Sequence, residues 1–146
     1  MDSANTNDVL NRLYAIHNRS LPKYISYARP WPEAGTEEAW KTIELIVADQ
    51  LRTIERLGEM LDARSFNVAA GEYPMSYTGL NDLSIEYLTE RMIEQQKRDI
   101  SSIEQCVEQL SLAPMAQTLA KESLGAAKGH LDSLIELTET KPRIAS

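Results

Sequence analysis

The sequence predicts an all-α protein built from four long helices, and three observations lead to this fold class. Apolar residues recur at intervals of three, four and seven over most of the chain, which is the spacing of helices with one buried face. Alternation of apolar and polar residues, the pattern of half-buried strands, is nearly absent. One connection is much longer than the others, which restricts how four helices can be joined.

The first helix is expected over residues 6–28. One face of it carries Leu10, Leu13, His17, Leu21, Tyr24 and Ala28. Pro22 falls inside this segment and lacks a backbone donor, so a kink is expected there. The following stretch, RPWPEAG, contains two prolines and a glycine and therefore ends the helix.

The remaining helices are expected over residues 36–64, 82–110 and 113–138. Thr36 is a suitable N-cap for the first of these, because two glutamates follow it at the positive end of the helix dipole. Pro114 is tolerable in the first turn of the last helix, where its missing donor is not needed. The last eight residues are expected to fray.

The connection between the second and third helices determines the predicted topology. It is about 16 residues long and can span about 50 Å when extended, whereas a helix of about 27 residues is roughly 40 Å long. The chain can therefore travel the length of the bundle at this point and make short turns elsewhere. We predict a single domain over residues 1–146, with its core over residues 6–138 and one long crossover between helices 2 and 3.

Composition excludes several classes of function. The formal net charge of −7 opposes binding to nucleic acid, which depends on Lys and Arg neutralising phosphates. The single cysteine, Cys106, cannot form an internal disulfide. The N-terminus shows no secretory signal, and no apolar run approaches the roughly 20 residues that span a bilayer. We therefore expect a cytoplasmic protein with neither nucleic-acid nor membrane partners.

Polar side chains interrupt the apolar stripes of the predicted helices. Gln50 falls on the stripe of the second helix, and Thr53 lies one turn away on the same side. His17 and His130, the two histidines of the chain, fall on the stripes of the first and fourth helices. Because buried polar groups need a hydrogen-bond partner or a ligand, these positions form the candidate site.

Three segments resemble the bacterioferritin and ferritin-like superfamily, over about residues 8–138. LNRLYAIHNRSLPKYISYAR is similar to the first helix of bacterioferritin, ADQLRTIERLGEMLDARSF to the second, and AKGHLDSLIEL to the end of the fourth. The resemblance implies a ferritin-like four-helix bundle. It also implies a di-iron site of four carboxylates and two histidines at the bundle centre.

The chain departs from the ligand pattern that this resemblance implies. His17 stands where the first helix should supply a glutamate. Gln50 and Thr53 replace the Glu and His of the second helix, Ala127 replaces the glutamate of the fourth, and His130 alone matches. Losing these carboxylates removes the negative charge that holds two divalent cations. We expect a degenerate di-iron site without ferroxidase activity.

The third helix leaves its ligand position open. Spacing from His130 points to Glu94, the apolar stripe points to Ile93, and Glu90 lies one turn earlier. Two interpretations of the interior follow. In one, His17, His130 and Glu94 hold a single Fe, Zn or Mn ion. In the other, the histidines belong to a buried hydrogen-bonded cluster and no metal is bound.

The leading functional hypothesis is a binding, structural or assembly protein without a cofactor. The alternative is a metal-dependent oxidoreductase or iron-handling protein centred on His17, Glu94 and His130. A third hypothesis is a small-ligand pocket lined by Tyr24, Trp40 and Gln50. Haem is not expected, because Leu51 stands where the haem-ligating methionine of bacterioferritin would be. We expect a homodimer or a monomer, with an unknown protein partner.

Overall fold

The structure is a computed structural model that describes residues 3–28, 34–69, 71–80 and 83–139. The helices are α1 (Ser3–Asn18), α2 (Leu21–Ala28), α3 (Glu37–Ala63), the 3₁₀ helix η1 (Met75–Leu80), α4 (Ile85–Gln109) and α5 (Pro114–Glu139). The described residues form no β-strand, which confirms the all-α class. None of these helices is long and apolar enough to cross a membrane.

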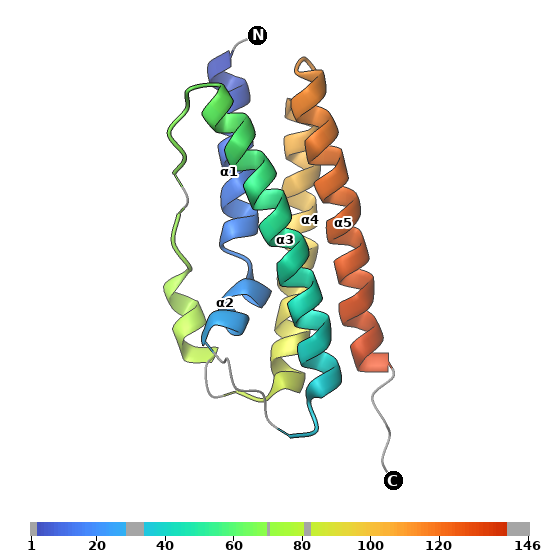
Figure 1. Ribbon diagram of the computed structural model, residues 1–146. Coiled ribbons are helices and arrows are strands. Elements are labelled where there is room, and N and C mark those ends of the chain that lie inside the picture. The colour runs from blue at the N-terminus through green and yellow to red at the C-terminus, as the bar shows by residue number, and fades with distance from the viewer. Residues whose placement is uncertain (1–2, 29–33, 70, 81–82, 140–146) are drawn as a thin grey trace.

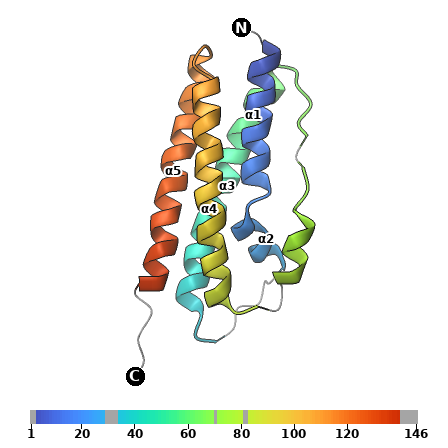
Figure 2. The same cartoon turned by 180° about the vertical axis from the view of Figure 1, so that it is seen from behind.

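The four long helices lie side by side along one axis (Figures 1 and 2). Helices α1 and α5 run in one direction, and α3 and α4 run in the other (Figure 1). After α3 the chain returns along the bundle beside α1 and reaches η1 before α4 begins. Asn11 of α1 holds this returning segment through two hydrogen bonds to the backbone of Ala69, at 3.1 and 2.9 Å.

The first predicted helix is divided into α1 and α2, so the expected count of four helices was wrong. Ser20 lies between the two helices, and its backbone N–H donates to His17 O at 3.4 Å, three residues back and not the four of an α-helix. Its side chain then caps α2 by accepting a hydrogen bond from Lys23 N at 3.2 Å. Pro22 lies in the first turn of α2, where no backbone donor is required. The kink expected at Pro22 is therefore a break at Arg19 and Ser20, just before it.

The other predicted helix bounds hold to within a few residues. Helix α3 begins directly after Thr36, and α5 begins at Pro114. Helix α4 begins three residues later than predicted, because Ser84 caps it by accepting a hydrogen bond from Tyr87 N at 3.2 Å. The predicted long connection contains η1 and is therefore not wholly irregular. Most of the tail that we expect to fray lies outside the described residues.

The core consists of two groups of buried apolar side chains, which follow one another along α3, α4 and α5. Helix α1 carries residues of the first group only, and α2 carries residues of the second only. The first group is Val9, Leu10, Leu13, Leu57, Leu61, Ile100, Ile103, Cys106, Leu110, Ala116, Leu119, Ala120 and Ala127. The second group is Leu21, Tyr24, Ile25, Trp40, Ile43, Ile46, Tyr77, Leu80, Ile85, Leu88, Met92 and Leu134. Between the residues of the two groups, the helices place polar side chains in the interior.

Candidate functional site

A layer of buried polar side chains lies between the two apolar groups. We call His17, Ser20, Gln50 and Gln96 the polar layer, and each of them is at most 5% exposed. An unsatisfied buried polar group costs roughly 1–3 kcal/mol. The hydrogen-bond partners of these side chains therefore indicate whether the layer is a structural feature or a binding site.

Gln50 is hydrogen-bonded to Ser20, which lies at the break between α1 and α2. Ser20 Oγ donates to Gln50 Oε1 at 2.7 Å while accepting from Lys23 N at 3.2 Å. Thr53, the other polar residue on this side of α3, is half-buried and donates to the Asp49 carbonyl of its own helix at 3.3 Å. The position of Gln50 on the buried stripe is thus explained by its role as the acceptor for the serine that caps α2.

Replacing Ser20 with alanine should lower the free energy of unfolding by about 2 kcal/mol. The substitution removes the cap of α2 and leaves Gln50 Oε1 buried without its donor, and each loss costs roughly 1 kcal/mol. Urea unfolding at pH 7 measures the change. Ser101→Ala, on the exposed face of α4, is the control and should stay within about 0.5 kcal/mol of the wild type. Equal stabilities for the two variants would show that Ser20 does not hold the break.

Gln96 is the polar residue that α4 contributes, and our sequence analysis did not identify it. Its Nε2 donates to the carbonyl oxygen of Ala127 on α5 at 3.0 Å. The short alanine side chain leaves this backbone oxygen within reach of a glutamine. Gln96 lies seven residues before Ile103, so the apolar stripe of α4 does contain the signal that would have found it. Ser123 is satisfied within α5, where Oγ donates to Ala120 O at 3.0 Å.

The three residues considered for the third predicted helix do not reach the polar layer. Glu90 and Glu94 are exposed on α4, and Ile93 is half-buried against the second apolar group. Glu94 therefore does not lie in the interior with His17. Across the part of the chain that the structure describes, no three His, Cys, Asp or Glu side chains are grouped so that they could hold a metal ion.

His130 is paired with Asp49, a residue that our sequence analysis also missed. The distance between His130 Nε2 on α5 and Asp49 Oδ2 on α3 is 2.8 Å. An ionised carboxylate only accepts hydrogen bonds, so Nε2 carries the proton. Burial opposes ionisation of Asp49, but hydrogen bonds from His130 and Arg52 outweigh it and hold the pKa of Asp49 below its usual value. Asp49 lies three residues after Ile46, at the edge of the buried stripe.

His17 is the member of the polar layer with an unsatisfied atom. Its side chain is 5% exposed, and within the described residues its buried Nε2 has no hydrogen-bond partner. Burial, and then the nearby charge of His130, lower the pKa of His17 from 6.5 to about 4. At neutral pH the His17 imidazole is therefore uncharged inside the bundle.

The residues present do not fit the di-iron centre that the resemblance implies. Gln50, Thr53 and Ala127 carry neither a carboxylate nor an imidazole. From α4, the amide of Gln96 enters the interior in place of a carboxylate. His130 matches the family pattern, but its Nε2 is engaged with Asp49. This set lacks the bridging oxygens that two hard cations require.

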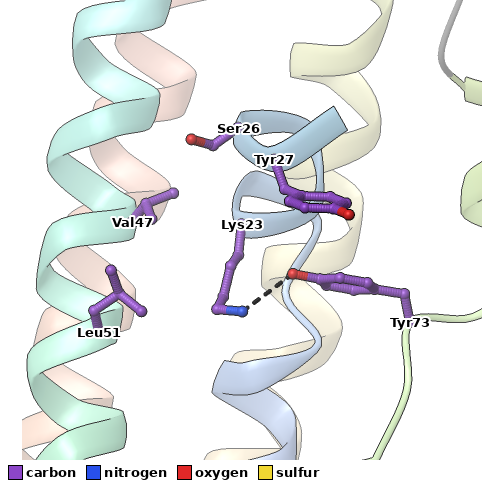
Figure 3. A pocket seen from close by; sticks show the side chains of 6 residues that line it. All are labelled: Lys23, Ser26, Tyr27, Val47, Leu51 and Tyr73. Atoms are coloured by element: carbon purple, nitrogen blue, oxygen red, sulfur yellow. Dashed lines mark hydrogen bonds between the residues drawn. The ribbon is translucent and has the colours of Figure 1, made fainter. Parts of the chain in front are cut away.

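Tyr24, Trp40 and Gln50, which we expect to line a ligand pocket, are all buried. The Tyr24 ring packs edge-on against Tyr73, with 5.0 Å between ring centres. A groove of about 410 Å³ lies nearby instead, between α2, α3 and the crossover (Figure 3). It is lined by Lys23, Ser26, Tyr27, Val47, Leu51 and Tyr73.

Comparison of the chain with family models, curated proteins and solved structures gives no match. Function must therefore be inferred from the polar layer and from the groove. These two features share one helix, because Ser20 of the polar layer caps α2 and Lys23 and Tyr27 of the groove belong to it.

Proposed function

We propose that this protein is a ferritin-like bundle without ferroxidase activity, which acts as a binding or structural protein. One observation carries the proposal. Each amide that occupies the interior is hydrogen-bonded to a protein group, since Gln50 Oε1 accepts from the Ser20 hydroxyl at 2.7 Å and Gln96 Nε2 donates to the Ala127 carbonyl at 3.0 Å. Side chains used in this way stabilise a fold and are not free to coordinate an ion.

The course of the chain supports the ferritin-like part of the proposal. Helices α3 and α4 run in the same direction, and the segment that joins them returns along the bundle (Figure 1). A single long crossover is the connection that distinguishes ferritin-like bundles from bundles in which all neighbouring helices are joined by short turns. The division of the first helix at Ser20 is a difference particular to this chain.

Electrostatics supports the absence of ferroxidase activity. Two divalent iron ions bring a charge of about +4 into the interior, which several carboxylates must offset. Asp49 is the carboxylate bonded to His130, and its charge is already offset by Arg52. The side chain of Asp49 is also 38% exposed, so it lies at the margin of the bundle.

A second candidate function, a single-metal oxidoreductase or iron-handling centre, is favoured by the unsatisfied Nε2 of His17. Such a centre would combine His17 and His130 with a carboxylate around one Fe, Zn or Mn ion. It would need Asp49 in place of the exposed Glu94, and His130 would have to leave its 2.8 Å hydrogen bond. Because of this cost, we place the candidate second.

Metal analysis distinguishes the two functions. After incubation with iron(II), zinc or manganese and gel filtration, we expect well under one metal ion per chain. We also expect iron(II) in air to oxidise no faster with the protein than in buffer. The control is His17→Ala combined with His130→Ala. One ion per chain in the wild type and none in this variant would establish the second function. Two ions with rapid oxidation would contradict both the absence of ferroxidase activity and the single-metal centre.

A further inference from the structure

The groove between α2, α3 and the crossover has the size of a small-molecule site. Its volume is about 410 Å³, within the range of roughly 300–1,000 Å³ that ligand pockets occupy. Figure 3 shows the Lys23 side chain between the wall of α3 and the ring of Tyr73. Three kinds of group line the groove, namely an ammonium, hydroxyls and apolar side chains.

Among the described residues that line the groove, Lys23 alone carries a charge, on its ammonium. Its Nζ donates to the hydroxyl of Tyr73 at 3.1 Å and lies 5.4 Å from the centre of the Tyr73 ring. No carboxylate of the described residues forms an ion pair with it. An ammonium has three donors, and Tyr73 uses one of them. In a chain with a net charge of −7, the groove is therefore a local site for an anion.

Both groups at this anion site are held in place by the fold. The backbone of Lys23 is fixed at the start of α2 by the Ser20 cap, which is bonded in turn to Gln50 of the polar layer. The ring of Tyr73 is held by edge-on packing against the buried Tyr24. A site that is ordered before binding loses less conformational entropy when a ligand enters.

The wall opposite Lys23 is apolar and open to solvent. Val47 and Leu51 lie one turn apart on α3 and face the groove (Figure 3). Leu51 is 47% exposed, and Tyr27 on the other side of the groove is 78% exposed. Apolar side chains with a small number of placed polar groups are the usual lining of a small-ligand site.

We propose that the groove binds a small amphiphilic carboxylate. Its carboxylate accepts a hydrogen bond from Lys23 Nζ, and its apolar chain covers Val47 and Leu51. A single ammonium matches the single negative charge of a carboxylate, and the apolar wall of α3 matches its chain. The inference rests on the proposed function, because it supplies the ligand of a bundle that acts by binding.

Titration of the full-length protein with octanoate tests the inference, with amide chemical shifts as the readout. We expect the amides of α2 and of residues 47–51 to shift and to give a dissociation constant. Lys23→Met should weaken octanoate binding by about tenfold or more, because a hydrogen bond to a charged group is lost. Lys97→Met, an exposed lysine on α4 outside the groove, is the matched control and should bind octanoate as the wild type does. Thermal unfolding checks that both variants are folded.

Three further probes identify what the groove recognises. Acetate lacks the apolar chain, 1-octanol lacks the charge, and octylamine carries the opposite charge, so each should bind at least about tenfold more weakly than octanoate. The inference fails if 1-octanol or octylamine binds as well as octanoate, or if Lys23→Met has no effect. It also fails if the wild type sediments as a dimer that Leu51→Asp dissociates, because a second copy would then cover the groove.

The two proposals fail in different experiments. Metal retained by His17 and His130 would overturn the proposed function, and the octanoate titration would still report on the groove. A metal-free protein that does not bind octanoate would overturn the inference about the groove alone.

Discussion

Replacing His17 with leucine should stabilise the protein by about 3 kcal/mol more at pH 4 than at pH 7. Burial holds the pKa of His17 at about 4 in the folded protein, against 6.5 in the unfolded chain. As the pH falls below 6.5, His17 becomes protonated in the unfolded chain but stays neutral in the folded protein until the pH approaches 4. The stability that neutral His17 allows is therefore complete above pH 6.5 and is lost between pH 6.5 and about 4. A difference of about 2.5 pKa units corresponds to about 3 kcal/mol.

Urea unfolding at pH 7, 5.5 and 4 measures this difference between the wild type and His17→Leu. At pH 7 the variant should be at least as stable as the wild type, because leucine removes a buried nitrogen that lacks a partner. The difference should then grow as the pH falls. A gap that does not change with pH would show that His17 titrates normally and that a donor or acceptor reaches its Nε2.

Replacing Asp99 with asparagine should stabilise the protein by about 2 kcal/mol at pH 7 and by much less at pH 4. Burial raises the pKa of Asp99 to about 6, although a hydrogen bond from Gln95 and the charges of Arg19 and Arg98 act in the opposite direction. The fold therefore favours the protonated carboxyl. The stability from this preference is complete below pH 3.8 and is lost as the pH rises through 6. The full shift corresponds to about 3 kcal/mol, which we reduce to about 2 because Asp99 is only half-buried.

Asparagine is a suitable replacement because its side-chain oxygen can still accept the hydrogen bond that Gln95 Nε2 makes to Asp99 Oδ1 at 3.1 Å. Asp132→Asn, at an exposed position on α5, is the matched control and should change stability by no more than about 0.5 kcal/mol. If Asp99→Asn is less stable than the wild type at pH 7, the carboxylate is stabilised by its arginine neighbours more than burial destabilises it.

The effects of His17 and Asp99 have opposite signs and overlap between about pH 4 and 6. In the wild type the two effects should largely offset each other, so the free energy of unfolding should change little over this pH range. In Asp99→Asn only the effect of His17 remains, so the free energy of unfolding should fall more steeply with decreasing pH than in the wild type. The double variant with His17→Leu should lose both effects.

Helix positions and buried faces could be predicted from the sequence because they depend on local periodicity. The 3.6-residue repeat located α3, α4 and α5 to within a few residues, and it placed His17 and Gln50 on buried faces, as the structure has them. The length of one connection allowed a crossover along the bundle. Net charge and the shortness of the apolar runs are likewise properties of the chain alone.

The sequence did not determine the partners of the buried polar groups. Glu94 and Gln96 are two residues apart, which is about 200° around a helix, so they lie on nearly opposite faces. An error of two residues in counting back from His130 therefore exchanges a buried residue for an exposed one. The Ser20 hydrogen bond to Gln50 joins residues 30 apart and requires the break before α2. The pairing of His130 with Asp49 depends on how α3 and α5 are aligned along the bundle.

The groove is also a product of tertiary structure. Lys23, Leu51 and Tyr73 come from α2, α3 and the crossover, and no motif in the sequence connects them. The sequence by itself therefore determined where α3, α4 and α5 lie and most of the residues on their buried faces, because neighbouring residues decide both. Only the packing of the helices decided which polar side chains meet and where a ligand can bind, because contacts between distant residues depend on the rotation and alignment of whole helices.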